Sequence, residues 1–203
     1  MTLLLSAVVG TDVHLATDSF QGAKGSKPIL AEKVLCWLDS AVVLTGFGDF
    51  CPPPTALRHR PGTERELGAC RNATERSETV RRALHPIVVR RGSSATCVLF
   101  DRAGELTVIT RLDRASGQEA WRVSGRLGAT WVAGNLRAIG LPSQPDLSCH
   151  GEVFANERAF RLWATDRLGA ATMWCLQNEP SMPTVQPPFY FYVVTSRDRL
   201  GAA

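Results

Sequence analysis

The alternation of apolar and polar residues predicts two β-hairpins in the first 50 positions of the chain. Four short apolar runs form them, residues 2–9 with 13–17 and residues 34–38 with 41–45. The connections at 10–12 and 39–40 contain the small and polar residues that tight turns prefer. Nearly every position of these runs is apolar, which is typical of strands that are covered on both faces. A glycine-rich loop is predicted between the two hairpins, over residues 19–32.

Helices and further strands are predicted over the rest of the chain. Three consecutive prolines make the segment 51–61 irregular, and Thr63-x-x-Glu66 has the pattern of a capping box before a short helix. A second helix is predicted over residues 74–85, with Pro86 ending it. Strands are predicted at 95–100, 106–110, 120–124, 129–133 and 189–195.

The longest amphipathic segment extends from Glu152 to Gln177. Several of its large apolar side chains fall at helical spacing: Phe154, Phe160, Trp163, Leu168 and Met173. Helices thus come in blocks between antiparallel hairpins, which favours an α+β fold with two antiparallel sheets packed together and helices outside. With 203 residues, the chain is expected to form a single domain over 2–203.

Composition and charge narrow the class of protein. Charged residues make up 21% of the chain and apolar residues 44%, as in ordinary globular domains, and the formal net charge is +4. The arginines concentrated between residues 58 and 91 have no recognition motif for nucleic acid, so a solvated helix face or a subunit contact is favoured there. No stretch approaches the length of a membrane span, so neither a nucleic-acid nor a membrane partner is expected.

The cysteines predict neither disulfides nor a metal site. The six are scattered without a Cys-x-x-Cys pair, and three of them lie in apolar runs, where a thiol behaves as a small buried hydrophobe: Cys36, Cys97 and Cys175. Cys149-His150 is an adjacent pair without partners at ligand spacing, so no metal and no cofactor are expected. The apolar opening lacks a basic segment and is soon interrupted by polar residues. It is therefore not expected to be a signal peptide, and a cytoplasmic location is favoured.

Thr2 is the first candidate for chemistry. Initiator methionine is usually removed before a small residue such as threonine, and removal of Met1 would give Thr2 a free α-amine. That amine can act as the base for the hydroxyl of the same residue, which makes a weak nucleophile reactive. Many chains begin Met-Thr for no catalytic reason, so the prediction depends on what surrounds Thr2.

Three further residues are predicted to gather around Thr2. If the runs 2–9 and 13–17 pair as a hairpin, their far ends meet and bring Asp18 close to Thr2. Lys33 directly precedes the third strand, from where its ammonium can favour the ionised hydroxyl while Asp18 orients and neutralises it. Gly46 follows the fourth strand, where a backbone N–H can be presented to a developing oxyanion.

In this order the residues resemble a known family. The segments Thr2, 15–19 (Leu-Ala-Thr-Asp-Ser), 33–34 (Lys-Val) and 45–48 (Thr-Gly-Phe-Gly) are similar to proteasome β-type subunits. They are also similar to the bacterial relatives of those subunits, including the peptidase of the two-component ATP-dependent protease. The separation of sixteen positions between Thr2 and Asp18 is that of the family, whereas Lys33 comes one position early.

The resemblance implies a fold, an activity and partners. It implies the four-layer αββα sandwich of the N-terminal nucleophile hydrolases, with Thr2, Asp18 and Lys33 as catalytic residues and Gly46 in the oxyanion hole. The implied reaction is cleavage of amide bonds in a peptide or protein through an acyl-enzyme on Thr2, without a cofactor. A homo-oligomer is implied, with an ATPase as a further partner.

The chain departs from the family at the supporting residues. Where the family has a Gly-Ser-Gly motif that supplies a serine, this chain ends the run 131–135 with Asn135, which is the candidate there. The family's second aspartate has no clean match before the last strand. Asn178, Glu179 and Ser181 are the nearest candidates in position, whereas Asp166 falls too early in the long helix. Ser19 is a further supporting candidate.

These departures keep an alternative function open. A non-catalytic ring or scaffold subunit would retain the fold and would tolerate an altered helix region and an incomplete set of supporting residues. A subunit of that kind has no need for threonine, aspartate and lysine together. The retention of Thr2, Asp18 and Lys33 therefore favours the enzyme.

Overall fold

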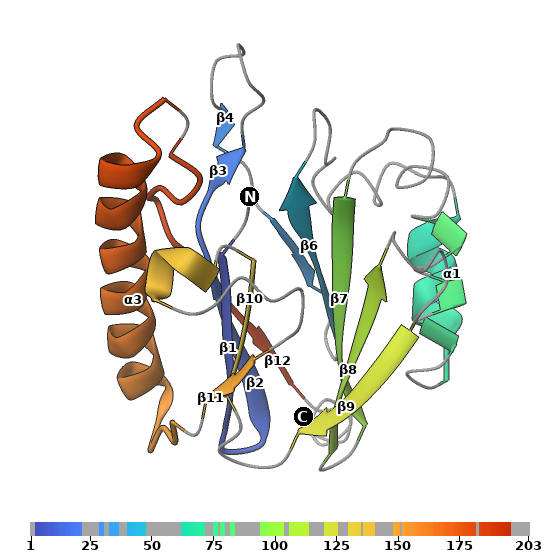
Figure 1. Ribbon diagram of the computed structural model, residues 1–203. Helices are drawn as coiled ribbons and strands as arrows, with labels where there is room; N and C mark the ends of the chain where they lie inside the picture. The colour runs from blue at the N-terminus through green and yellow to red at the C-terminus, as the bar shows by residue number, and fades with distance from the viewer. Residues whose placement is uncertain are drawn as a thin grey trace.

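In the computed structural model, the chain folds into two antiparallel sheets that face each other (Figure 1). The structure describes residues 3–21, 29–30, 33–36, 40–47, 62–71, 75–76, 78–79, 82–83, 94–103, 106–113, 120–125, 130–134, 136–140, 148–150, 152–181 and 183–195.

The first sheet is built around the amino-terminal hairpin. Its order is β11 (Ser148–His150), β10 (Thr130–Gly134), β1 (Leu3–Val9), β2 (Asp12–Thr17) and β12 (Tyr190–Val194), with neighbours antiparallel. Every residue of β1 is buried, as its continuous apolar run predicts. Gly10 turns the chain between β1 and β2 with a φ of 61°, a conformation that glycine adopts without strain. The first predicted hairpin is thus confirmed.

The second sheet contains the second predicted hairpin. Its order is β5 (Val34–Cys36), β6 (Ser40–Phe47), β7 (Ser94–Ala103), β8 (Leu106–Asp113) and β9 (Ala120–Gly125), again with antiparallel neighbours. Cys36 pairs with Ala41, so β5 and β6 are joined by a short connection. The strands predicted at 95–100 and 106–110 are also confirmed, although both extend further than the apolar runs indicate.

The predicted loop 19–32 is not wholly irregular. It contains two short strands, β3 (Phe20–Gln21) and β4 (Ile29–Leu30), which pair antiparallel with each other in a separate two-stranded sheet. The sequence analysis missed them because two-residue strands are too short to give an alternating pattern.

A short helix, α1 (Thr63–Ala69), lies at the predicted place, but its predicted cap is wrong. The residue that caps the helix is Gly62, with a φ of 87°, and no side chain caps the amino-terminal end. The carbonyl of Gly62 accepts from the N–H of Glu66 at 2.8 Å. Within the predicted helix 74–85, the described residues in 75–83 are helical. The segment 51–61, which is predicted to be irregular, lies outside the described residues.

The long helix α3 (Glu157–Asn178) covers the outer face of the first sheet (Figure 1). Asn156 caps it, because its side-chain oxygen accepts from the N–H of Ala159 at 2.9 Å. The buried face repeats every three or four residues: Phe160, Ala164, Leu168, Ala171 and Cys175. The predicted apolar face is wrong at Met173, which is 56% exposed.

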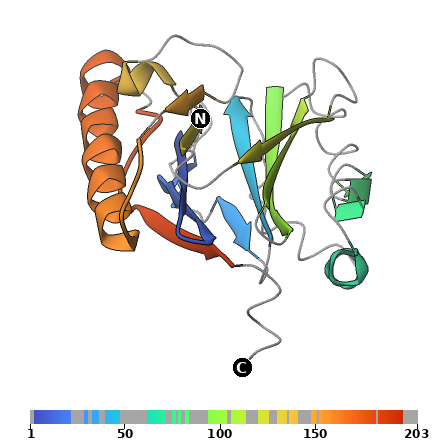
Figure 2. The same cartoon turned by 90° about the horizontal axis from the view of Figure 1, so that it is seen from below.

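The helices lie on opposite sides of the paired sheets. Figures 1 and 2 show α3 against the first sheet and α1 beyond the side of the second sheet that faces away from the first. A one-turn helix, η2 (Leu136–Ile139), packs beside α3. Among the described residues, no helix is long and apolar enough to cross a membrane, and no three His, Cys, Asp or Glu residues are grouped as metal ligands. The thiol of Cys175 is fully buried, as predicted.

Candidate active site

Asp18 lies at the end of β2, where the first hairpin places it next to the start of β1. Because Leu4 pairs with Thr17, the residue after Thr17 comes to lie beside the residue before Leu4. The side chain of Asp18 is fully buried, and its Oδ1 accepts from the backbone N–H of Leu3 at 2.9 Å. The predicted meeting of the two strand ends is confirmed at Leu3.

Lys33 reaches the same carboxylate from the other sheet. It directly precedes β5, is only 5% exposed, and its Nζ donates to Oδ2 of Asp18 at 2.6 Å. One carboxylate therefore holds the first residue of β1 with one oxygen and the lysine with the other. This ion pair ties the two sheets together at the end where β1 begins.

The electrostatics of Asp18 reflect two opposing effects. Burial raises the pKa of Asp18 above its ordinary value of 3.8, because a desolvated carboxylate is less stable than a carboxyl group. The charge of Lys33, its hydrogen bond and the hydrogen bond from Leu3 all lower the pKa, but burial is the larger effect. Removing either charge would leave its partner buried without compensation, a change that destabilises proteins by about 3–5 kcal/mol.

Ser19 is a fully buried neighbour of this pair, and it is held by a residue that the sequence analysis missed. Its N–H donates to the carbonyl of Gln186 at 3.2 Å, and its Oγ donates to the same carbonyl at 3.3 Å. Gln186 acts through its backbone, so no side-chain motif could have pointed to it. The pair of prolines directly after it was the only local signal of an unusual backbone.

Gly46 lies near the end of β6, paired with Ala95 of β7. The pairing of β5 with β6 begins at Val34 and Val43, so β6 runs three residues past that point to Gly46, alongside the segment that holds Lys33. The two predicted site residues Lys33 and Gly46 thus belong to the same end of the second sheet.

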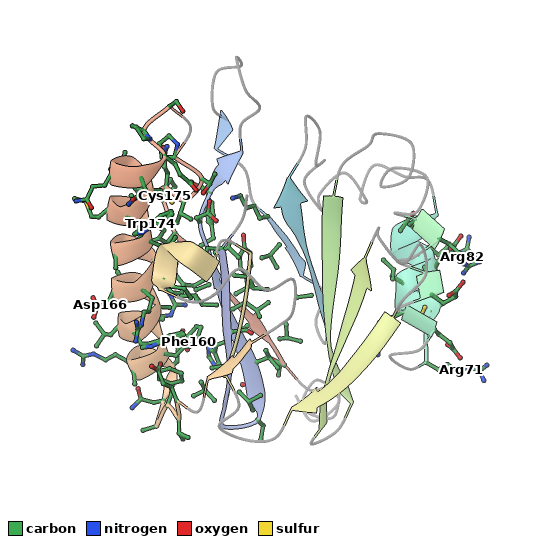
Figure 3. All side chains as sticks on the ribbon, in the orientation of Figure 1. Arg71, Arg82, Phe160, Asp166, Trp174 and Cys175 are labelled. Atoms are coloured by element: carbon green, nitrogen blue, oxygen red, sulfur yellow. The ribbon has the colours of Figure 1, made fainter. Side chains whose placement is uncertain are left out.

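Of the predicted site residues Thr2, Asn135 and Ser181, only Ser181 lies in the part of the chain that the structure describes. Thr2 and Asn135 lie outside the described residues. Ser181 is exposed in the turn after α3, and no hydrogen bond of the described residues joins it to Asp18 or Lys33. Figure 3 shows Asp166 on the outer side of α3, pointing away from the first sheet.

Two arginines of the 58–91 segment, Arg71 and Arg82, lie far from this site. Figure 3 shows Arg71 and Arg82 on the outer side of the α1 region, at the opposite side of the molecule from Phe160 and Cys175. Both arginines are exposed, as expected of a solvated face, whereas Arg76 of the same segment is only 4% exposed.

Comparison with solved structures finds the same fold in proteasome-like proteins. Anbu from Yersinia bercovieri matches with a TM-score of 0.57 and 12% identity over 95% of this chain and 81% of that one. Eukaryotic HslV from Trypanosoma brucei matches with a TM-score of 0.54 and 13% identity over 94% of this chain and 98% of that one. Anbu from Hyphomicrobium sp. strain MC1 matches with a TM-score of 0.55 and 11% identity over 98% and 89%.

The chain shares its fold with these Anbu and HslV structures. At such low identity the likeness carries the fold and nothing about activity. No protein-family model matches the chain, and no curated protein matches it in sequence.

Proposed function

We propose that this protein is an N-terminal threonine hydrolase that cleaves amide bonds of peptides through an acyl-enzyme on Thr2, after removal of Met1. The observation that carries the proposal is the buried carboxylate of Asp18, which binds Lys33 Nζ at 2.6 Å and the N–H of Leu3 at 2.9 Å. Leu3 directly follows Thr2 in the chain. Thr2 is therefore only one residue away from the residue whose N–H the Asp18 carboxylate binds.

The first half of the proposed reaction forms an ester. The Oγ of Thr2 attacks the substrate carbonyl carbon while its proton passes to the α-amine of the same residue. The oxyanion that forms accepts a hydrogen bond from the N–H of Gly46. When the C–N bond breaks, the proton on the α-amine passes to the leaving amine, and the acyl group stays on Thr2 Oγ.

The second half releases the acid. A water molecule attacks the ester carbonyl, its proton passes to the α-amine, and collapse of the intermediate returns that proton to Thr2 Oγ. Throughout, the positive charge of Lys33 favours the ionised hydroxyl, and Asp18 keeps that ammonium in place in a site where a lone charge would be unstable.

The buried pair is unlike a surface ion pair. An exposed ion pair would be screened by water and would contribute little, whereas Lys33 and Asp18 are 5% and 0% exposed. Charges held in a poorly solvated place act strongly on a reacting group nearby. This is the reason to assign the pair a chemical role as well as a structural one.

The finer properties of the protein follow from the same proposal. The arrangement of two sheets with helices outside is the four-layer αββα sandwich. The substrate is a peptide or protein, the protein works as a homo-oligomer in the cytoplasm, and an ATPase is its further partner.

Intact mass of the purified protein, with and without an electrophile selective for N-terminal threonine, tests the proposal. We expect a mass that lacks Met1 and one adduct per chain, which is lost in the Thr2→Ala variant. A retained Met1, or a mature chain that forms no adduct, would overturn the proposed hydrolase activity. The non-catalytic ring or scaffold subunit would then be the remaining hypothesis.

A further inference from the structure

The segment after α3 is attached to the neighbour of Asp18. We call residues 183–186 the brace. At its far end the carbonyl of Gln186 accepts two hydrogen bonds from one residue, from the N–H of Ser19 at 3.2 Å and from its Oγ at 3.3 Å. A carbonyl oxygen has two lone pairs, so Ser19 can use both.

The prolines after the brace explain why the contact takes this form. The pairing of β2 with β12 extends to Thr17 and Tyr190, and the next positions toward the brace include Pro187 and Pro188. Neither proline has an N–H to donate, so the regular ladder cannot continue past this point. Ser19 replaces the ladder with two hydrogen bonds to the residue that precedes the prolines.

The near end of the brace is fixed to α3. The Oγ1 of Thr184 donates to Oε2 of Glu179 at 2.8 Å and lies 3.5 Å from Sγ of Cys175. Thr184 is 3% exposed, and Val185 is fully buried in the hydrophobic core with Phe160 and Leu168 of α3. The brace therefore connects the packed end of a long helix to Ser19.

We propose that the brace positions the site carboxylate, with Ser19 as a positioning residue that acts through Asp18. Asp18 and Ser19 share a peptide bond, and the oxygens of Asp18 bind Leu3 and Lys33. A shift of Ser19 is passed to that carboxylate and then to both of its partners. The inference rests on the proposed function, because it assigns a role to Ser19 in the reactivity of Thr2.

The test is the rate at which the threonine-selective electrophile acylates Thr2 in three single variants. Ser19→Ala removes one hydrogen bond to the brace, and Thr184→Val removes the bond between the brace and Glu179. The matched control is Thr172→Val, because the Thr172 hydroxyl donates to the carbonyl of Leu168 at 2.9 Å within α3 but not to the brace.

We expect acylation to fall about ten-fold in Ser19→Ala and about three-fold in Thr184→Val, because small displacements of a catalytic group reduce rates steeply. Thr172→Val should react at the parent rate. Both substitutions weaken the same connection between α3 and Ser19. The acylation rate of the double variant should therefore fall by less than the product of the two single fold-changes. Rates equal to the control in both single variants, or fully multiplicative effects in the double variant, would overturn the brace.

Hydrogen exchange at the Leu3 amide, measured by NMR, separates this inference from the proposed function. That N–H is bound by Asp18, so its exchange should quicken about ten-fold in Ser19→Ala and rise in Thr184→Val, but not in Thr172→Val. If Thr2 of the parent protein forms no adduct, the proposed function fails, and this exchange still decides the brace. Equal exchange in all three variants would overturn it.

Discussion

Strand β2 buries two ionisable groups, and it accommodates them in opposite ways. At its end, Asp18 is fully buried and bound by Lys33 and Leu3. Four residues earlier, His14 is 6% exposed and packs its ring against Phe160 of α3, with 5.8 Å between the ring centroids. The first group is compensated by an opposite charge, whereas the second is packed as an aromatic ring.

The pKa directions follow from this difference. Burial lowers the pKa of His14 below its ordinary value of 6.5, an effect that Arg161 adds to while Glu157 and Asp12 oppose it. Burial raises the pKa of Asp18, and Lys33 opposes it. Burial favours the neutral form in both cases, but only Asp18 is held by a charge that makes an ionised state useful. Burial alone therefore does not distinguish the two groups; the buried opposite charge beside Asp18 does.

The largest effect is expected from breaking the ion pair. Lys33→Met should lower the free energy of unfolding by about 3–5 kcal/mol, because it leaves a buried carboxylate without its partner. The measurement is chemical denaturation at pH 7. Asp18→Asn should destabilise the protein to a similar extent, because Lys33 is then buried without its partner even though the amide oxygen can still accept from the N–H of Leu3.

The double variant sharpens this result. Lys33→Met with Asp18→Asn should recover much of the stability that Lys33→Met loses, because neither charge then remains. Neither Lys33→Met nor the double variant should form the adduct on Thr2. A double variant that is as unstable as the sum of the two single effects would show that the residues do not act as a pair.

The sequence predicted the strands of this region better than the contacts between them. The continuous apolar runs of β1 and β2 determine their hairpin, and the hairpin alone brings Asp18 to Leu3, so this half of the site followed from local pattern. That Lys33 would cross from one sheet to the other depends on how the sheets pack, which periodicity does not contain; the sequence places Lys33 only at the start of the third strand.

Other elements could not be predicted for different physical reasons. Gln186 holds Ser19 through a backbone carbonyl, which every residue type offers. The predicted capping box would make Thr63 the cap of α1. Instead the left-handed backbone of Gly62 makes Gly62 the cap, so that Thr63 is already the first residue of the helix. Met173 fits the helical spacing of the apolar face but lies on the solvent side, since a large apolar residue at approximate spacing does not fix which face is buried.

A smaller effect is expected from His14, and it depends on pH. Above 6.5 the imidazole is neutral in the folded and unfolded chains. Below 6.5 the unfolded chain binds a proton that the folded chain binds only at lower pH, so the free energy of unfolding should fall on acidification. Asp18 acts in the opposite sense, because its raised pKa favours the folded protein at low pH and this contribution is lost as pH rises above 3.8.

Unfolding of the parent protein and of His14→Gln, measured between pH 7.5 and about 5, isolates the histidine. The variant should be flatter with pH than the parent, while the chain's other three histidines titrate in both proteins and cancel in the difference. Parallel pH profiles would mean that His14 is as easily protonated in the folded protein as in the unfolded one.

The smallest effect is expected at Thr17, a third buried polar residue in this part of the chain. Within the described residues, its hydroxyl has neither an opposite charge, as Asp18 has, nor the ring packing of His14. Thr17 lies between Leu4 and Tyr190 in the sheet, is fully buried, and its Oγ1 has no hydrogen-bond partner in the part of the chain that the structure describes. Thr17→Val keeps the branched shape that suits a strand and removes the unpartnered hydroxyl, so the free energy of unfolding should rise by about 1 kcal/mol. Thr172→Val, which removes a bonded hydroxyl, should not gain stability. A lower free energy of unfolding in Thr17→Val would instead mean that the Thr17 hydroxyl forms a hydrogen bond in the folded protein. In that case Thr17, like Asp18 and His14, would be stabilised by its surroundings.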